Sequence, residues 1–108
     1  MHVVTLKRLK EAATKYRDAA KEIAAWHLIA KESRWTSFID VQKTFPDADA
    51  VDGFVVFNIR HNRYRLVTII HYAKEQQGRQ TIGHVYIRSF LTHKQYDNKA
   101  NWDKEFGQ

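Results

Sequence analysis

A short segment near the end of the chain gathers side chains suited to phosphate chemistry. Residues 86–97 read YIRSFLTHKQYD, in which Arg88 lies inside an apolar strand pattern and His93 and Tyr96 follow directly after it. Arginine offers a planar, charged fork for phosphate oxygens, histidine titrates near neutral pH, and a tyrosine phenol can donate a hydrogen bond. Because His93 and Tyr96 are three residues apart, one helical turn would place them on the same face.

These residue types fit the cleavage of RNA without a metal ion. The 2′-hydroxyl then attacks the adjacent phosphate, so the protein has to accept the 2′-proton, stabilise the pentavalent phosphate and protonate the leaving 5′-oxygen. We assign the charge to Arg65 and Arg88 and the proton transfers to His93 and Tyr96, leaving open which residue is acid and which is base. Each also has a purely structural interpretation: the arginines can cap the sheet edge, Arg88 can pair with Asp97, His93 can be a surface residue, and Tyr96 can pack its ring or stack a base.

The positive charge of the chain is concentrated around these residues. The net charge is +6, and residues 54–97 alone hold seven basic side chains against two acidic ones, with five arginines among the seven. An anionic polymer is the natural partner of such a segment, although a solvated basic surface remains the alternative. Further candidate RNA contacts are Asn58, Arg60, Asn62, Arg63 and Lys94; the two asparagines can also be simple turn formers.

Other classes of function are disfavoured by what the sequence lacks. Cysteine is absent, and His2, His27, His71 and His84 have no acidic or cysteine partner at ligand spacing, so we expect neither a metal site nor a cofactor. We see no apolar run near the roughly 18 residues of a membrane span and no signal peptide, which predicts a cytoplasmic protein without membrane contact. We see no helix-turn-helix pattern with a basic recognition helix in the sequence, which argues against a DNA-binding repressor acting alone. A non-catalytic RNA- or ribosome-binding module that uses the same basic face remains open.

The elements that must position these residues are helices followed by strands. The sequence predicts a short strand at 2–5, a helix from Leu6, a second helix capped by Asp18, a third, short helix started by a Thr36-Ser37/Asp40 capping box, and an acidic loop at 47–53. Strands at 54–59, 64–72 and 82–91, joined by polar turns at 60–63 and 74–79, predict an antiparallel meander.

The predicted architecture is α+β, a single domain over residues 1–97 with N-terminal helices packed on a small antiparallel sheet, followed by a polar tail at 98–108. Both faces of the 64–72 strand are apolar in the middle, so we expect both to be covered in part. Arg65 and Arg88 can lie on neighbouring strands, although their register is not readable from the sequence. Strict alternation would put Ile87, Ser89 and Leu91 on one side of their strand and Arg88 with Phe90 on the other.

Three segments resemble the HigB toxins of type II toxin–antitoxin systems, within the RelE-like superfamily: MHVV at the start, FNIRHNRYRLV at 57–67 and VYIRSFLTHKQYD at 85–97. The resemblance implies a RelE-like fold and metal-independent endoribonuclease (mRNA interferase) cleavage of mRNA, often on the ribosome. It also implies a HigA-like helix-turn-helix antitoxin and contact with operator DNA only through the toxin–antitoxin complex. The strand arginines correspond to Arg65 and Arg88, the THxxYD segment supplies His93, Tyr96 and Asp97, and Asn58 and Asn62 match the family pattern.

Overall fold

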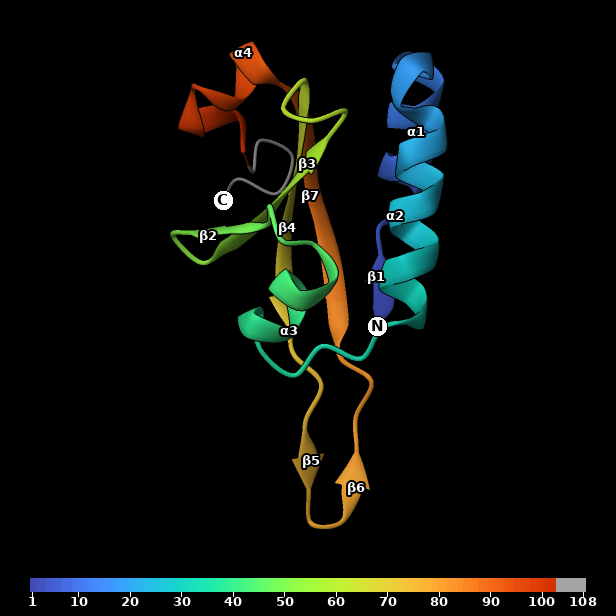
Figure 1. Cartoon of the computed structure of the whole chain (residues 1–108), viewed down its shortest axis with the longest axis vertical. Helices are drawn as coiled ribbons and strands as arrows, with labels where there is room; N and C mark the ends of the chain where they lie inside the picture. The colour runs from blue at the N-terminus through green and yellow to red at the C-terminus, as the bar shows by residue number, and fades with distance from the viewer. Residues whose placement is uncertain (103–108) are drawn as a thin grey trace.

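The chain forms a main sheet and a small two-stranded sheet (Figure 1). The computed structural model describes residues 1–102. The elements in chain order are β1 (His2–Val4), α1 (Leu6–Lys15), the 3-10 helix η1 (Arg17–Ala19), α2 (Ala20–Glu32), α3 (Phe38–Thr44), β2 (Asp49–Val51), β3 (Phe54–Ile59), β4 (Tyr64–His71), β5 (Glu75–Gln76), β6 (Arg79–Gln80), β7 (His84–Thr92), α4 (His93–Tyr96) and the 3-10 helix η2 (Lys99–Asn101). Helices α1 and α2 lie on one side of the main sheet, and α4 lies on the other (Figure 1). The α+β class predicted from the sequence is confirmed.

The first two helices pack side by side, as expected, but their junction differs from the prediction. Helix α2 begins after Ala19, and no side chain caps it. The carboxylate of Asp18 instead accepts hydrogen bonds of 2.8 Å from Nη1 of Arg63 and from the hydroxyl of Tyr64. The expected cap at Asp18 is therefore wrong, because partners 45 and 46 residues away in sequence occupy the carboxylate that would have served the local amides.

The start of α3 follows the predicted capping pattern. Ser37 is the N-cap, and its hydroxyl accepts a hydrogen bond from the backbone N–H of Asp40. The Asp40 carboxylate in turn accepts a 2.9 Å hydrogen bond from the backbone N–H of Thr36. These two reciprocal bonds satisfy amides that a helix start leaves without partners.

The meander of β3, β4 and β7 is confirmed as the centre of a sheet with the strand order β1-β7-β4-β3-β2. Two features go beyond the expected small antiparallel sheet. Strand β1 pairs with β7 in parallel, which makes the sheet mixed, and residues 49–51 of the expected acidic loop form the edge strand β2 beside β3. The expected turn at 74–79 contains most of the β5–β6 hairpin, which extends beyond the main sheet in Figure 1.

Strand β7 does not keep a regular alternation of its side chains. Ser89 and Ile87 pair with consecutive residues of β4, so Arg88 is the extra residue of a β-bulge. Ile87 consequently packs in the core beneath the helices, whereas Leu91 packs on the opposite side of the sheet. The expectation that Ile87, Ser89 and Leu91 share one side is wrong, because a single inserted residue reverses the sides of a strand.

The two faces of the sheet carry two separate apolar clusters. The helix face, which lies beneath α1, α2 and α3, contains the larger cluster, with Trp26, Trp35 and Phe57 buried at its centre. The opposite face, which we call the α4 face, carries Arg65 and the smaller cluster of Val56, Val67, Leu91 and Trp102. The prediction that both faces of the 64–72 strand are partly covered is therefore confirmed.

Ordered packing continues past Asp97, the predicted end of the domain. Trp102 is only 6% exposed, and its indole Nε1 donates a 2.7 Å hydrogen bond to the carbonyl oxygen of Tyr96. The hydroxyl of Ser89 donates to the carbonyl oxygen of Trp102 at 2.6 Å. Residues 98–102 thus fold back over the α4 face, whereas positions 103–108 of the predicted polar tail lie outside the described residues.

Candidate active site

Arg65 lies at the centre of the candidate site, near the start of β4. It pairs with Asn58 on β3 and with Leu91 on β7. Its guanidinium carbon lies 4.7 Å from the centre of the Tyr96 ring, a cation–π contact. Its Nε is buried and has no hydrogen-bond partner among the described residues. Because a buried donor without a partner is unfavourable, this N–H group is suited to donate a hydrogen bond to a ligand oxygen, such as that of a phosphate.

Helix α4 brings Tyr96 to Arg65. A capping box starts this one-turn helix, in which the Thr92 hydroxyl accepts from the N–H of Gln95 and the Gln95 side chain accepts from the N–H of Thr92. The backbone N–H of His93 also donates to the carbonyl oxygen of Arg63 at 2.9 Å, which ties α4 to the β3–β4 turn directly before β4. The position of Tyr96 is therefore set by β4 as well as by β7.

Trp102 and Arg65 flank the Tyr96 ring. The indole of Trp102 stacks on Tyr96 with ring centres 4.4 Å apart and planes 14° apart. The same indole makes a T-shaped contact with Phe54 of β3. An indole and a guanidinium at such distances cannot share one face of a phenol ring. Both faces of Tyr96 are thus covered, which leaves its hydroxyl as the group available to a substrate and disfavours base stacking by this residue.

Burial raises the pKa of the Tyr96 phenol above its ordinary value, and the charge of Arg65 partly opposes that rise. Tyr96 therefore stays protonated at neutral pH, where it can donate a hydrogen bond or a proton. The same contact with Arg65 stabilises the phenolate that would remain after proton donation. Among the roles that the sequence left open for Tyr96, the acid role fits this environment better than the base role.

His93 lies on α4 one turn before Tyr96, with a half-exposed side chain. Its Nε2 is 3.9 Å from a carboxylate oxygen of Asp97, so a protonated imidazole has an anionic partner there. Arg88 is half-buried on the strand next to β4, as the sequence predicts for neighbouring strands. Leu91 rather than Arg88 is opposite Arg65, so the two arginines are offset along the sheet.

The candidate RNA contacts lie in three places. Asn58 is paired with Arg65, and Lys94 is exposed on α4. Arg63 instead forms a 2.8 Å ion pair with Asp18 on the side of the helices. The β3–β4 turn holds Arg60, Asn62 and, between them, His61. Arg60 and His61 have left-handed φ angles of 56° and 61°, whereas Asn58 and Asn62 do not have a positive φ.

Comparison with known proteins places the chain in a family. The profile of the HigB toxins, described as the RelE-like toxic component of a toxin–antitoxin system, matches residues 19–99. The chain belongs to the HigB toxin family. It is 30% identical over 100 residues to the mRNA interferase toxin HigB of Escherichia coli strain K12, an alignment that covers 90% of this chain and 88% of that relative. The proteins named mRNA interferase HigB from Escherichia coli O157:H7 and Shigella flexneri match with the same identity and coverage.

Membership in this family implies an antitoxin as a partner. Three further side chains support the site of this HigB-family chain, and the sequence patterns do not predict them: Trp102 stacks on Tyr96, Gln95 completes the capping box, and Ser89 anchors the returning chain. The isolated tryptophan in a polar segment was the available signal, because a large aromatic side chain is costly to leave in water.

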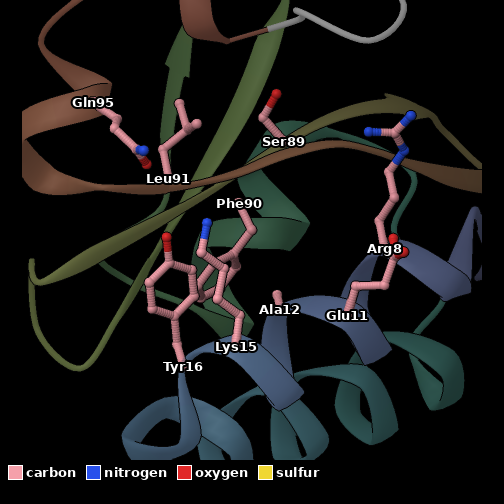
Figure 2. Close-up of a pocket in the computed structure, with 9 residues that line it drawn as sticks. All are labelled: Arg8, Glu11, Ala12, Lys15, Tyr16, Ser89, Phe90, Leu91 and Gln95. Atoms are coloured by element: carbon pink, nitrogen blue, oxygen red, sulfur yellow. The ribbon is translucent and has the colours of Figure 1, made fainter.

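A pocket of about 250 Å³ lies between α1 and the edge of β7, outside the Arg65–Tyr96 contact. Figure 2 shows Arg8 and Lys15 directed from α1 toward β7, with Glu11 beside Arg8. β1 covers this edge of β7 only from His84 to Tyr86, which leaves the edge open where the pocket lies. We do not assign the chemistry to this pocket, because its lining includes neither Arg65 nor Tyr96.

Within the described part of the chain, residues 1–102, the helices lack the length and the apolar composition that a membrane span requires.

Proposed function

We propose that this HigB-family chain is the toxin of a type II toxin–antitoxin system and cleaves mRNA as a metal-independent endoribonuclease. The observation that carries the proposal is the contact of the Arg65 guanidinium with the ring of Tyr96, whose phenol is held protonated. A fixed cation beside a proton donor is the pair of groups that phosphodiester cleavage needs on the side of the leaving oxygen. The relatives named mRNA interferase support the same reaction.

The reaction begins with attack of the 2′-hydroxyl oxygen on the adjacent phosphorus. The 2′-proton passes to the imidazole of His93 as the new O–P bond forms, while Arg65 and Arg88 stabilise the pentavalent phosphate. The bond between phosphorus and the 5′-oxygen then breaks, and the Tyr96 phenol donates its proton to that oxygen. The products are a 2′,3′-cyclic phosphate and a free 5′-hydroxyl, and transfer of the proton from His93 to Tyr96 through solvent restores the starting state.

The other RNA contacts follow from their places around this centre. Asn58 is adjacent to Arg65 on β3, and Lys94 lies on α4, so both are within reach of phosphates flanking the scissile bond. We propose the same role for Arg60 and Asn62 in the β3–β4 turn. Arg63 contributes once RNA competes with Asp18 for its guanidinium.

The partners in this proposal are those of a translation inhibitor. The chain acts in the cytoplasm on mRNA that is engaged with the ribosome, and it is neutralised by a HigA-like helix-turn-helix antitoxin. Operator DNA is bound only by the toxin–antitoxin complex, through the antitoxin. These assignments rest on family membership together with the cationic segment at 54–97.

The test is to map RNA 5′ ends after a brief pulse of expression. Wild-type protein should generate new 5′-hydroxyl ends within coding regions, whereas Arg65→Ala and His93→Ala should generate few or none. Arg79→Ala is the matched control for the arginine, because Arg79 is exposed on the β5–β6 hairpin away from the site. Cleavage by both site variants at the wild-type level would overturn the assignment. Growth arrest without new RNA ends would favour the non-catalytic binding module.

A further inference from the structure

Four rings lie next to one another on the sheet, away from the Arg65–Tyr96 contact. Strand pairing puts His2 of β1 and His71 of β4 on either side of His84 of β7. The ring centres of His2 and His84 are 5.4 Å apart, those of His84 and Tyr86 are 5.9 Å apart, and those of Tyr86 and His71 are 4.9 Å apart. We call these four side chains the ring row.

The ring row lies on the α4 face of the sheet. The residues that alternate with it, Val3, Ile70 and Val85, belong to the core under the helices, so the rings point to the other side. His2 and His71 are exposed, and His84 and Tyr86 are half-buried. Unlike Trp26, Trp35 and Phe57 at the centre of the helix-face core, these four therefore keep part of their surface in contact with solvent.

The rings are aligned with the proposed catalytic centre along the same two strands. Tyr86 pairs with Ile69, four residues along β4 from Arg65. At a rise of about 3.3 Å per residue, this separation is roughly 13 Å. At about 3.4 Å per nucleotide, the spacing along each strand of duplex DNA, a nucleic-acid strand crosses it in about four nucleotides. A strand held at Arg65 can thus reach the ring row without leaving the sheet.

The chemistry of the ring row suits a single-stranded nucleic acid. Flat side chains stack on bases of any sequence, and a cationic surface holds the backbone between them. The segment at 54–97, which supplies three of the four rings, has five more basic than acidic residues. Among the described residues, no group of three or more His, Cys, Asp or Glu side chains is placed to hold a metal ion together, which favours stacking over ligation for these histidines.

We propose that the ring row is a stacking platform for bases of the RNA strand whose phosphate is held at Arg65. The exposed rings of His2 and His71 supply the faces on which bases stack. The rings of His84 and Tyr86, which lie between them, support them. The inference rests on the proposed function and extends it, because it gives the enzyme a second RNA contact that contributes to binding and not to the chemical step. RNA too short to span both places then makes only the contacts at Arg65.

The experiment measures the binding of a single-stranded RNA of about ten nucleotides, within the usual site sizes for single strands. The RNA carries 2′-O-methyl groups throughout, so it cannot be cleaved, and affinity is read by fluorescence anisotropy at low salt. The double variant His2→Ala/His71→Ala should bind about tenfold or more weakly, because each lost stack corresponds to about 5- to 150-fold in affinity. The double variant His2→Phe/His71→Phe keeps two flat rings and should bind like wild type.

Two controls separate stacking from loss of structure. His27→Ala removes a histidine from α2, outside the ring row, and should leave the affinity unchanged. Thermal melting should show that the alanine double variant is folded at the temperature of the assay. Unchanged affinity in the alanine variant, or an equal loss in the phenylalanine variant, would overturn the proposal.

Other occupants of this surface would give different results. If the alanine variant binds the oligonucleotide normally but co-sediments less with ribosomes, the ring row contacts the ribosome and the proposal is wrong. If it changes from dimer to monomer in sedimentation with normal RNA affinity, a second copy covers the surface and the proposal is wrong. Failure of the proposed function is visible separately, as intact cleavable RNA after incubation with wild-type protein and ribosomes.

Discussion

Tyr96 is useful to the proposed reaction because its surroundings restrict it to one task. Arg65 and Trp102 cover the ring, and burial keeps the phenol protonated by raising its pKa. Only the hydroxyl is left to interact with a substrate. The environment thereby narrows the roles of a residue type that, by itself, can stack, hydrogen-bond or transfer a proton.

Replacing Tyr96 with Phe should lower kcat by about 10²–10⁴-fold with little change in KM, since the ring remains and only the proton donor is lost. Because the pKa of the acid is raised, the active protonated form persists in mildly alkaline solution and is lost only as the pH rises through that raised pKa. The alkaline limb of the kcat profile should therefore disappear in the variant. Tyr72→Phe is the matched control, because Tyr72 follows directly after β4 and packs against the helix-face core, away from Arg65.

Asp18 should contribute to stability in a pH-dependent way. Hydrogen bonds from Tyr64 and then Arg63 hold the pKa of the Asp18 carboxyl below its ordinary value. A depressed pKa in the folded state stabilises the protein above the pKa of the unfolded chain, and this stabilisation is lost as the pH falls through the lower, folded value. Asp18→Asn should lower the melting temperature at pH 7 and have less effect in acid, in melts followed by circular dichroism. An equal decrement at both pH values would contradict the linkage.

At the scale of elements, α4 is a single turn that relies on its caps. A helix this short is not stable by itself in water. The capping box between Thr92 and Gln95 and the hydrogen bond from His93 to Arg63 therefore matter more here than they would in a long helix. The site depends on these contacts, because α4 carries both proposed proton-transfer residues.

Thr92→Ala should remove the cap and lower the free energy of unfolding by about 0.5–2 kcal/mol. RNA cleavage should fall as well, because α4 would hold Tyr96 less firmly against Arg65. Denaturant unfolding and initial cleavage rates measure the two effects. Thr14→Ala, on an exposed position of α1 where the hydroxyl bonds only to a carbonyl one turn earlier, is the control and should leave cleavage unchanged.

At the scale of the whole molecule, the chain uses the two faces of its sheet for different purposes. The helix face holds an aromatic core in which Phe57 contacts Trp26, Trp35 and Phe45. The α4 face holds a smaller cluster, the candidate site and the ring row. Stability comes mostly from one side of the sheet, which leaves the other side available for polar and charged groups.

Phe57→Ala should destabilise the whole fold by about 3–5 kcal/mol, because the side chain is fully buried and three aromatic rings would face the resulting cavity. The measurement is a urea unfolding curve, read as a shift in midpoint. Ile39→Ala is the comparison, since Ile39 is 65% exposed on α3 and its truncation should change stability by about 0.5 kcal/mol or less. Similar shifts for the two variants would argue against this core.

RNA binding should weaken steeply with salt, because each phosphate neutralised on a single strand releases counterions. The slope of log affinity against log salt is about −0.7 for each phosphate contact. Arg65→Ala should make the slope shallower by about one contact, whereas Arg79→Ala should leave it nearly unchanged. Titrations of an uncleavable RNA at several salt concentrations provide the measurement. An affinity independent of salt would contradict an electrostatic interface.

Local patterns determined much of this protein directly from the sequence. Apolar periodicity and turn residues gave the helices, the three central strands and the α+β class, and the capping pattern at Thr36–Asp40 placed α3. The positions of Arg65, His93 and Tyr96 on a strand and on the turn after β7 follow from the same reasoning. These features depend on interactions between residues close in sequence, so the spacing of apolar, capping and turn residues predicts them.

The tertiary structure decided the features that depend on contacts between distant segments. The bulge at Arg88, the parallel pairing of β1, the recruitment of Asp18 by β4 and the return of Trp102 onto Tyr96 each join residues far apart in the chain. A polar carboxylate or a lone tryptophan has several possible partners in a sequence, and only the packed chain selects among them. The site combines residue types that the sequence supplies with a geometry that folding imposes.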